Sequence, residues 1–245
     1  MAKATTLLFD CDNTLVLSET LAFEACADLA NEILAAEGIS DRYTGPALFT
    51  EFVGQNFRGM MSSLQKKYHL SLPPETFDAY VTREEDAVIA KIRASLVPCA
   101  GADEVLASLA ETKRYELAVV SSSAGRRVQA SVEKVGMDVY FPPDHIFSAA
   151  TSLPVPTSKP DPAIYLHACK MLGKRPAECV AIEDSKNGTL SAVRAGIRTV
   201  GYIGSYEKEE QEKMRAVLSE AGAAPIMEHW KEFEGILEGL ESASH

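Results

Sequence analysis

No apolar run in this 245-residue sequence reaches the roughly 18 residues that a membrane-spanning helix needs. The apolar stretch near the N-terminus is short and is interrupted by two aspartates, which is atypical of a secretory signal peptide. The five cysteines are scattered, odd in number and free of any CxxC spacing, as is usual for reduced thiols. We therefore expect a cytoplasmic protein with no membrane partner.

Basic residues are scarce, with 24 Lys and Arg against 35 Asp and Glu and a formal net charge of −11. Because nucleic acids are bound through basic surfaces, this balance argues against a nucleic-acid partner. An anionic substrate would have to be attracted locally, by a metal ion or a few basic groups. The five histidines form no cluster of the kind that holds zinc.

Short apolar runs alternate with helical patterns over most of the chain. The runs are brief and mostly lack polar alternation, which is typical of strands buried on both faces. Strands that alternate with helices indicate βαβ units and a parallel sheet, so an α/β fold is predicted. The predicted strands are 5–9, 116–120, 145–149, 178–182 and 198–203, and the predicted helices include 102–112, 126–135, 163–172 and 189–195.

One region contains only helical patterns, at 20–37, 57–69 and 75–94. We therefore predict two domains: an α/β core of residues 1–15 and 97–245, and a helical insert of residues 16–96 that follows the first strand. The densely charged segment 206–220 is predicted to be a solvated surface helix, and residues 238–245 a frayed end.

Two aspartates, Asp10 and Asp12, follow the first predicted strand. Ligands gather at the carboxyl ends of strands in an open α/β sheet. Two carboxylates at that edge can divide two tasks, attack on phosphorus and proton transfer. The alternative is that they shape a turn or cap the next helix.

Three further signals follow later predicted strands. Ser121–Ser123 can hold phosphate oxygens through hydroxyl and backbone N–H groups, or can merely cap a helix. Lys159 lies between Ser158 and Pro160-Asp161-Pro162, and the prolines make this loop rigid. A lysine on a rigid loop can bind a phosphate or a carboxylate, although a loop lysine is usually solvated. Glu183 and Asp184 suit a hard divalent cation, or cap a helix. Four such signals in order at strand ends make coincidence a poor explanation.

Four parts of the sequence resemble the four motifs of haloacid dehalogenase-like hydrolases. They are the run LLFDCDNTLVLSE, the predicted strand that ends at Ser121, the run SKPDP and the run VAIEDSKNGTLSAVRAG. The spacing is similar to that of the subfamily with a helical cap between the first two motifs. That subfamily contains β-phosphoglucomutase and small sugar-phosphate phosphatases. The resemblance implies a Rossmann-like parallel sheet with helices on both faces and a small all-helical cap inserted after the first strand.

The resemblance also implies roles for individual residues. Asp10 would form an aspartyl-phosphate, and Asp12 would act as general acid and base. Ser121 and Lys159 would hold the transferring phosphate. Magnesium would be held by Asp10, by Asp12 through its carbonyl, and by Asp184, with Glu183 ligating the ion or orienting its waters. Expected substrate-binding residues are Ser122 in the core and Glu19, Gly54, Gln55, Asn56 and Arg58 in the cap.

One departure from the family concerns Asn13, where glycine is usual. Asparagine is the next best tolerated residue at positive φ, so we expect the motif to survive. Thr14, and the absence of a cap-hinge histidine, favour a phosphatase over a phosphomutase, the closest alternative. A non-catalytic binding protein is the other alternative, although no motif aspartate is lost. We expect the protein to be a Mg²⁺-dependent phosphatase that acts on a small phosphorylated metabolite. We expect it to be a monomer, with a dimer as the alternative.

Overall fold

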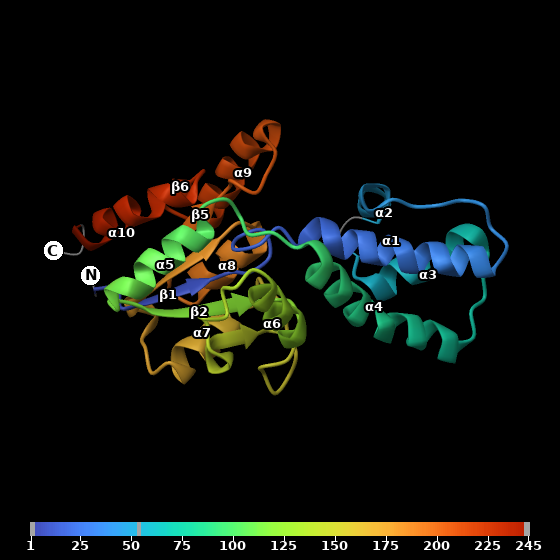
Figure 1. The fold of residues 1–245 in the computed structure, drawn as a ribbon, viewed down its shortest axis with the longest axis horizontal. Helices are drawn as coiled ribbons and strands as arrows, with labels where there is room; N and C mark the ends of the chain where they lie inside the picture. The colour runs from blue at the N-terminus through green and yellow to red at the C-terminus, as the bar shows by residue number, and fades with distance from the viewer. Residues whose placement is uncertain (1–2, 53–54, 243–245) are drawn as a thin grey trace. The chain divides into compact units, whose positions relative to one another are not determined.

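The computed structural model describes residues 3–52 and 55–242 and divides the chain into two compact units (Figure 1). The first unit joins residues 1–17 to residues 97–245, and the second contains residues 18–96. Within the described residues, no helix combines the length and the apolar character that a membrane crossing requires.

A six-stranded parallel sheet forms the centre of the first unit. Its order, β3-β2-β1-β4-β5-β6, places the first strand between the second and the fourth. Leu8 in β1 pairs with Ala118 on one side and Ala181 on the other, which fixes the register. The carboxyl ends of β2, β1 and β4 therefore lie next to one another. The strands are β1 (Thr6–Phe9), β2 (Glu116–Ser121), β3 (Ile146–Ser148), β4 (Cys179–Glu183), β5 (Arg198–Tyr202) and β6 (Ile226–Met227).

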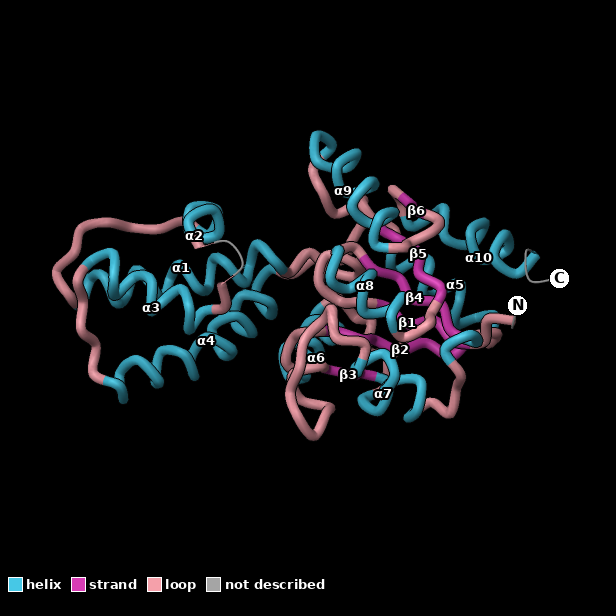
Figure 2. The backbone as a smooth tube through the Cα atoms, turned by 180° about the vertical axis from the view of Figure 1, so that it is seen from behind, coloured by secondary structure: helices cyan, strands magenta, loops and turns pink. Residues whose placement is uncertain are grey.

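Both faces of this sheet are covered by helices, as Figures 1 and 2 show from opposite sides. On one face, Leu8 packs in a cluster with Ile164 from α7 and Ala192 from α8. On the other face, the ring of Phe9 lies 6.0 Å from that of Trp230 and 6.2 Å from that of Phe233. The α/β fold class is thus confirmed. The helices of this unit are α5 (Ala102–Thr112), α6 (Gly125–Lys134), α7 (Ala163–Met171), α8 (Lys186–Arg194), α9 (Lys208–Ala221) and α10 (Phe233–Ser242), with 3₁₀ turns η1 (Pro143–His145), η2 (Pro176–Glu178) and η3 (Trp230–Glu232).

The second unit is a helical bundle with its own apolar core, which includes the fully buried Leu34 and Leu48. Local sequence signals set its helix boundaries. Thr44 accepts a hydrogen bond from the backbone of α2, which has a proline in its first turn, and Asn56 does the same for α3. The left-handed residue His69 ends α3. The helices are α1 (Glu19–Ala36), α2 (Gly45–Glu51), α3 (Phe57–Tyr68) and α4 (Pro74–Ser95).

The chain leaves and re-enters the first unit along two adjacent extended segments. Val16 forms an antiparallel bridge with Pro98, and the Leu17 N–H donates to the Val97 carbonyl at 3.1 Å. This pairing satisfies backbone groups at the point where the helical insert begins and ends.

Three features differ from the expectations. The short helix α2 and the two-residue edge strand β6 were not predicted. The prediction of a frayed end from residue 238 was wrong up to Ser242, because α10 buries Phe233 and Leu237 and its Glu241 accepts a hydrogen bond from Tyr115 at 2.8 Å. Residues 243–245 lie outside the described chain.

Candidate active site

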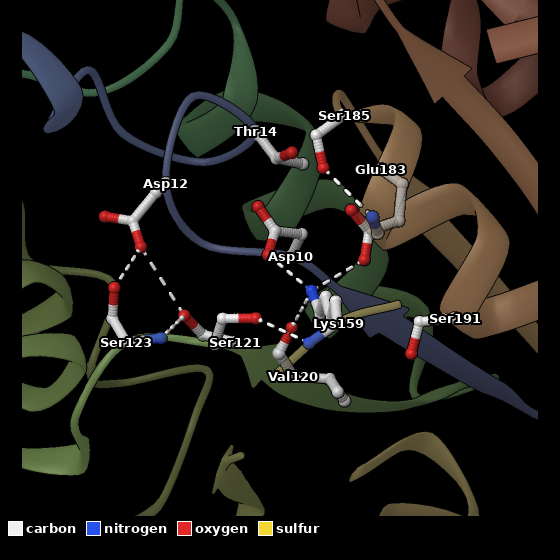
Figure 3. Close-up of polar contacts among 12 residues, drawn as sticks. Asp10, Asp12, Thr14, Val120, Ser121, Ser123, Lys159, Glu183, Ser185 and Ser191 are labelled. Carbon is white, nitrogen blue, oxygen red and sulfur yellow. Dashed lines mark hydrogen bonds and ion pairs between the residues drawn. The ribbon is translucent and has the colours of Figure 1, made fainter. Parts of the chain in front are cut away.

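A buried lysine joins two acidic side chains at the carboxyl edge of the sheet (Figure 3). The Lys159 ammonium donates to Asp10 Oδ1 at 2.6 Å, to Glu183 Oε1 at 2.6 Å and to the Val120 carbonyl at 2.7 Å. An ammonium group has three N–H donors, and all three are used here. A phosphate oxygen that bonds Lys159 must therefore replace one of these acceptors.

The loop that carries Lys159 is fastened to the loop after β2. The Lys159 backbone N–H donates to Ser122 Oγ at 3.2 Å, and Ser148 Oγ donates to the Ser123 carbonyl at 2.7 Å. Ser122, expected to bind substrate, thus supports the lysine loop in this structure. The Lys159 side chain is buried although its loop follows β3, which is an edge strand of the sheet.

The turn after β1 shows why asparagine replaces the usual glycine. Asn13 has φ of +57°, in the left-handed region, as its residue type led us to expect. The Leu15 and Val16 N–H groups both donate to the Cys11 carbonyl, at 2.9 and 3.1 Å, which closes the turn. The Trp230 indole donates to the Thr14 carbonyl at 3.2 Å and anchors it to the core.

Asp12 lies beside the loop after β2. Its Oδ2 accepts from Ser123 Oγ at 2.6 Å and from Ser121 Oγ at 3.5 Å, and its Oδ1 lies 3.8 Å from the Arg127 guanidinium. Asp12 is part-exposed, whereas Asp10 is buried. A carboxylate with access to solvent and to hydroxyl partners is suited to proton transfer. From its sequence, Ser123 was expected only to hold a phosphate oxygen or to cap a helix, as part of the serine run, and Arg127 carried no signal.

Glu183 is fully buried at the end of β4. Its Oε1 accepts hydrogen bonds from Lys159 and from the hydroxyl of Tyr165, while its Oε2 has no hydrogen-bond partner among the described residues. A Cβ built on Gly188 would lie 1.7 Å from Oε2, so the carboxylate sits directly against the backbone of α8. Any larger residue at this position would displace the Glu183 carboxylate.

Asp184 follows on the next residue and is also buried. Its Oδ2 accepts from the Tyr206 hydroxyl at 3.1 Å, and its Oδ1 accepts from Thr14 Oγ1 at 3.4 Å. Neither tyrosine that contacts these acids carried a sequence signal. Tyr165 lies among apolar residues, where a tyrosine usually indicates core packing, and Tyr206 begins the charged segment that we expected to be solvated.

Burial raises the pKa of the three buried acids, Asp10, Glu183 and Asp184. Burial raises the pKa of Asp10, against the lowering effect of the Lys159 ammonium, and raises that of Glu183 to about 7. Burial, together with the negative charges of Asp10 and Glu183, raises the pKa of Asp184 well above its usual range. For Lys159, the two carboxylates outweigh the lowering effect of burial, so its pKa is raised and it stays charged.

These residues fit a divalent cation. Among the residues that the structure describes, Asp10, Glu183 and Asp184 each offer an oxygen, and these oxygens lie within 4.8 Å of one another. Three buried acids face one ammonium, so a further positive charge would offset their mutual repulsion. Oxygen-only ligands suit Mg²⁺ rather than zinc.

The residues expected to bind substrate from the cap lie in the second unit. Glu19 is the first residue of α1 and lines a hollow of about 210 Å³ with Phe23 and Phe49. The Gln55 and Asn56 side chains accept hydrogen bonds from residues of α3, Gln55 from Ser63 Oγ and Asn56 from the Gly59 N–H. Arg58 pairs with Asp78 at 2.8 Å. Gly54 lies outside the described residues.

The family model of the haloacid dehalogenase-like hydrolases matches residues 4–196. The chain belongs to this family. A 6-phosphogluconate phosphatase from Escherichia coli (strain K12) is 28% identical over 197 residues, which cover 80% of this chain and 81% of that protein. A phosphorylated carbohydrates phosphatase from Thermotoga maritima is 28% identical over 222 residues, which cover 90% and 93%.

A solved structure supports the fold. The crystal structure of a predicted phosphoglycolate phosphatase from Haemophilus somnus matches with a TM-score of 0.76 and 21% identity, covering 96% of this chain and 99% of that one. The family match and the phosphatase relatives confirm the predicted enzyme class, a phosphoric monoester hydrolase.

Proposed function

We propose that the protein is a Mg²⁺-dependent phosphatase that hydrolyses a small phosphorylated metabolite through an aspartyl-phosphate on Asp10. The observation that carries the proposal is the Lys159 ammonium bound to Asp10 Oδ1 at 2.6 Å, beside the acids Glu183 and Asp184. A carboxylate next to fixed positive charge and a candidate cation site is equipped to attack an anionic phosphate ester.

In the first step, an Asp10 oxygen attacks phosphorus and the bond from phosphorus to the leaving-group oxygen breaks. Asp12 donates the proton that this oxygen needs. In the second step, Asp12 takes a proton from water, which attacks phosphorus and releases inorganic phosphate and free Asp10. Lys159 keeps the nucleophile in place, and Ser121 holds a phosphate oxygen. Mg²⁺, held by Asp10, Asp184 and the Asp12 carbonyl with Glu183 beside them, would neutralise charge on the phosphoryl group.

We propose a sugar or polyol phosphate, or a phosphoglycolate-like molecule, as the substrate class. The relatives named for 6-phosphogluconate and for phosphorylated carbohydrates support this class. A cytoplasmic location, a monomeric state and the lack of nucleic-acid and membrane partners stay predictions.

The test is a panel of phosphorylated metabolites with inorganic phosphate release as the readout. We expect turnover with Mg²⁺, loss of turnover in EDTA, and weak support by Ca²⁺, because its larger and looser coordination misplaces the phosphate. Full turnover in metal-free buffer would refute the metal requirement.

A phosphomutase is the principal alternative, since it would form the same aspartyl-phosphate. Incubation with β-glucose 1-phosphate and a catalytic amount of its 1,6-bisphosphate, followed by phosphorus NMR, separates the two. A phosphatase gives glucose and phosphate at most. Formation of glucose 6-phosphate faster than phosphate release would identify a mutase. A protein that binds these compounds without converting any of them would be a binding protein.

A further inference from the structure

Tyr165 is a buried polar residue that the proposed reaction does not use. It lies in the third position of α7, and its side chain is completely shielded from solvent. Its hydroxyl donates to Glu183 Oε1, the same oxygen that accepts from the Lys159 ammonium. Its ring also faces that ammonium, with Lys159 Nζ 5.2 Å from the ring centroid. Tyr165 therefore contacts both members of the buried Lys159–Glu183 pair.

The other side of Glu183 is closed by backbone. Oε2 lies against Gly188, where even a Cβ would lie 1.7 Å from it, and no residue in the described part of the chain hydrogen-bonds to it. The Gly188 N–H donates to Ser185 Oγ at 3.1 Å, the cap of α8. Within residues 3–52 and 55–242, Glu183 thus accepts hydrogen bonds at one oxygen only. Without the Tyr165 hydroxyl, Lys159 would be the sole hydrogen-bond donor to Glu183 among the residues that the structure describes.

The position of Lys159 depends in turn on Glu183. The ammonium is shared among Asp10, Glu183 and the Val120 carbonyl at 2.6 to 2.7 Å. If the Glu183 carboxylate rotates or shifts, one of these three acceptors moves, and the ammonium moves with it. A displacement of about 1 Å in such a group is enough to reduce a rate by roughly 100-fold.

We propose that Tyr165 is a positioning residue. Its hydroxyl fixes the Glu183 carboxylate by a hydrogen bond, its ring contacts the Lys159 ammonium, and together these contacts keep the ammonium bound to the nucleophile Asp10. The proposal rests on the proposed function, in which Asp10 is the nucleophile. Tyr165 touches neither substrate nor the reacting atoms in this account; it acts through Glu183 and Lys159.

Two substitutions separate the contributions of the hydroxyl and the ring. Tyr165→Phe keeps the ring over Lys159 and removes the bond to Glu183, whereas Tyr165→Leu removes both. We expect kcat to fall about 10-fold in the first and about 100-fold in the second, while KM and the half-saturating Mg²⁺ concentration change less than about threefold. Tyr115→Phe is the matched control, because it deletes a tyrosine–glutamate bond, to Glu241 at 2.8 Å, at the opposite end of β2. It should retain wild-type kcat.

A second readout does not depend on turnover. The crystal structure of metal-free Tyr165→Phe should show the Glu183 carboxylate rotated and the Lys159–Asp10 contact longer than in the wild-type crystal structure. An unmoved Lys159, or kcat within twofold of wild type, would overturn the proposal. So would a kcat loss that saturating Mg²⁺ restores, because the defect would then lie in metal binding. Wild-type enzyme that hydrolyses no phosphate ester would contradict the proposed function instead, and the crystallographic comparison would still decide the role of Tyr165.

Discussion

Two lysines in this protein each donate three hydrogen bonds to oxygen atoms, but their surroundings are very different. In the first unit, Lys159 gives its three N–H donors to Asp10, Glu183 and a carbonyl. In the second unit, Lys67 bonds both Glu51 oxygens at 2.7 and 2.9 Å and the Tyr43 hydroxyl at 2.8 Å. Each ammonium also faces an aromatic ring at just over 5 Å.

Solvent is what distinguishes the two clusters. The side chains of Lys159 and Glu183 are 5% and 0% exposed, whereas those of Lys67 and Glu51 are 42% and 36% exposed. Water screens the exposed pair, so it contributes little to stability. In the buried cluster the cost of desolvation is large, and removing one charge leaves the others uncompensated. We therefore expect that loss of the lysine lowers stability and activity substantially only in the buried cluster.

The largest effect should come from the nucleophile. We expect Asp10→Asn to lower kcat at least ~10³-fold with the fold intact, because an amide neither attacks phosphorus nor ligates Mg²⁺ well. Asp28→Asn is the control, since Asp28 pairs with Lys91 at 2.8 Å on the exposed surface of the second unit. Steady-state kinetics and circular dichroism provide the measurement. An Asp10→Asn enzyme with more than a tenth of wild-type turnover would refute the assignment.

The comparison of the two lysines can be tested directly. Lys159→Met should lower kcat about 100-fold and the free energy of unfolding by about 3 kcal/mol, because buried carboxylates lose their cation. Lys67→Met should leave kcat unchanged and alter the unfolding free energy by less than about 1 kcal/mol. Denaturant unfolding of the metal-free variants measures both changes. Equal losses in the two variants would show that burial does not separate these clusters.

The pH dependence of stability should show a smaller effect. The pKa of Glu183 is raised from an ordinary 4.5 to about 7, so the folded state binds its proton more tightly than the unfolded state does. Its contribution to stability is therefore greatest below pH ~4.5 and falls as the pH rises toward ~7. In metal-free protein, we expect wild type to lose stability relative to Glu183→Gln between pH 5 and pH 7.5, and Mg²⁺ to restore it at pH 7.5. Parallel pH profiles of the two proteins would contradict this.

The positions of the acids could be predicted because they depend on sheet topology. An apolar run such as Thr6–Phe9 is recognisable as a buried strand, and parallel strands bring the residues that follow them to one edge. The role of Asn13 was predictable for a similar reason, since few residues tolerate its positive φ.

The partners of those acids could not be predicted in the same way. Tyr165 lies among apolar residues of α7, and nothing in its spacing distinguishes a hydroxyl aimed at Glu183 from ordinary core packing. The two-residue strand β6 is too short for a periodic pattern. The helix α2, with seven residues, carries a Thr44 cap and a proline that are also common in turns.

The smallest effect on activity should come from substitution of Arg58, the cap residue expected to bind the leaving group of the substrate. Arg58 pairs with Asp78 and lies 5.2 Å from the Phe77 ring centroid. An exposed ion pair of this kind is weak enough to be exchanged for a bond to substrate. We therefore expect Arg58→Ala to change kcat/KM by about 3- to 30-fold, unequally across substrates, while phosphoenzyme formation from a minimal phosphoryl donor stays near normal.

The chain offers a closely matched control for this last prediction. Arg83 has the same exposure, 53% against 54%, pairs with Glu32 at 2.9 Å and lies 5.1 Å from the Tyr80 ring centroid. If loss of an exposed arginine acted only on the stability of the second unit, Arg83→Ala and Arg58→Ala would lower activity alike and equally for all substrates. If Arg58 contacts the leaving group, only Arg58→Ala changes the ratio of kcat/KM between substrates. Uniform losses across the substrate panel would assign Arg58 a structural role.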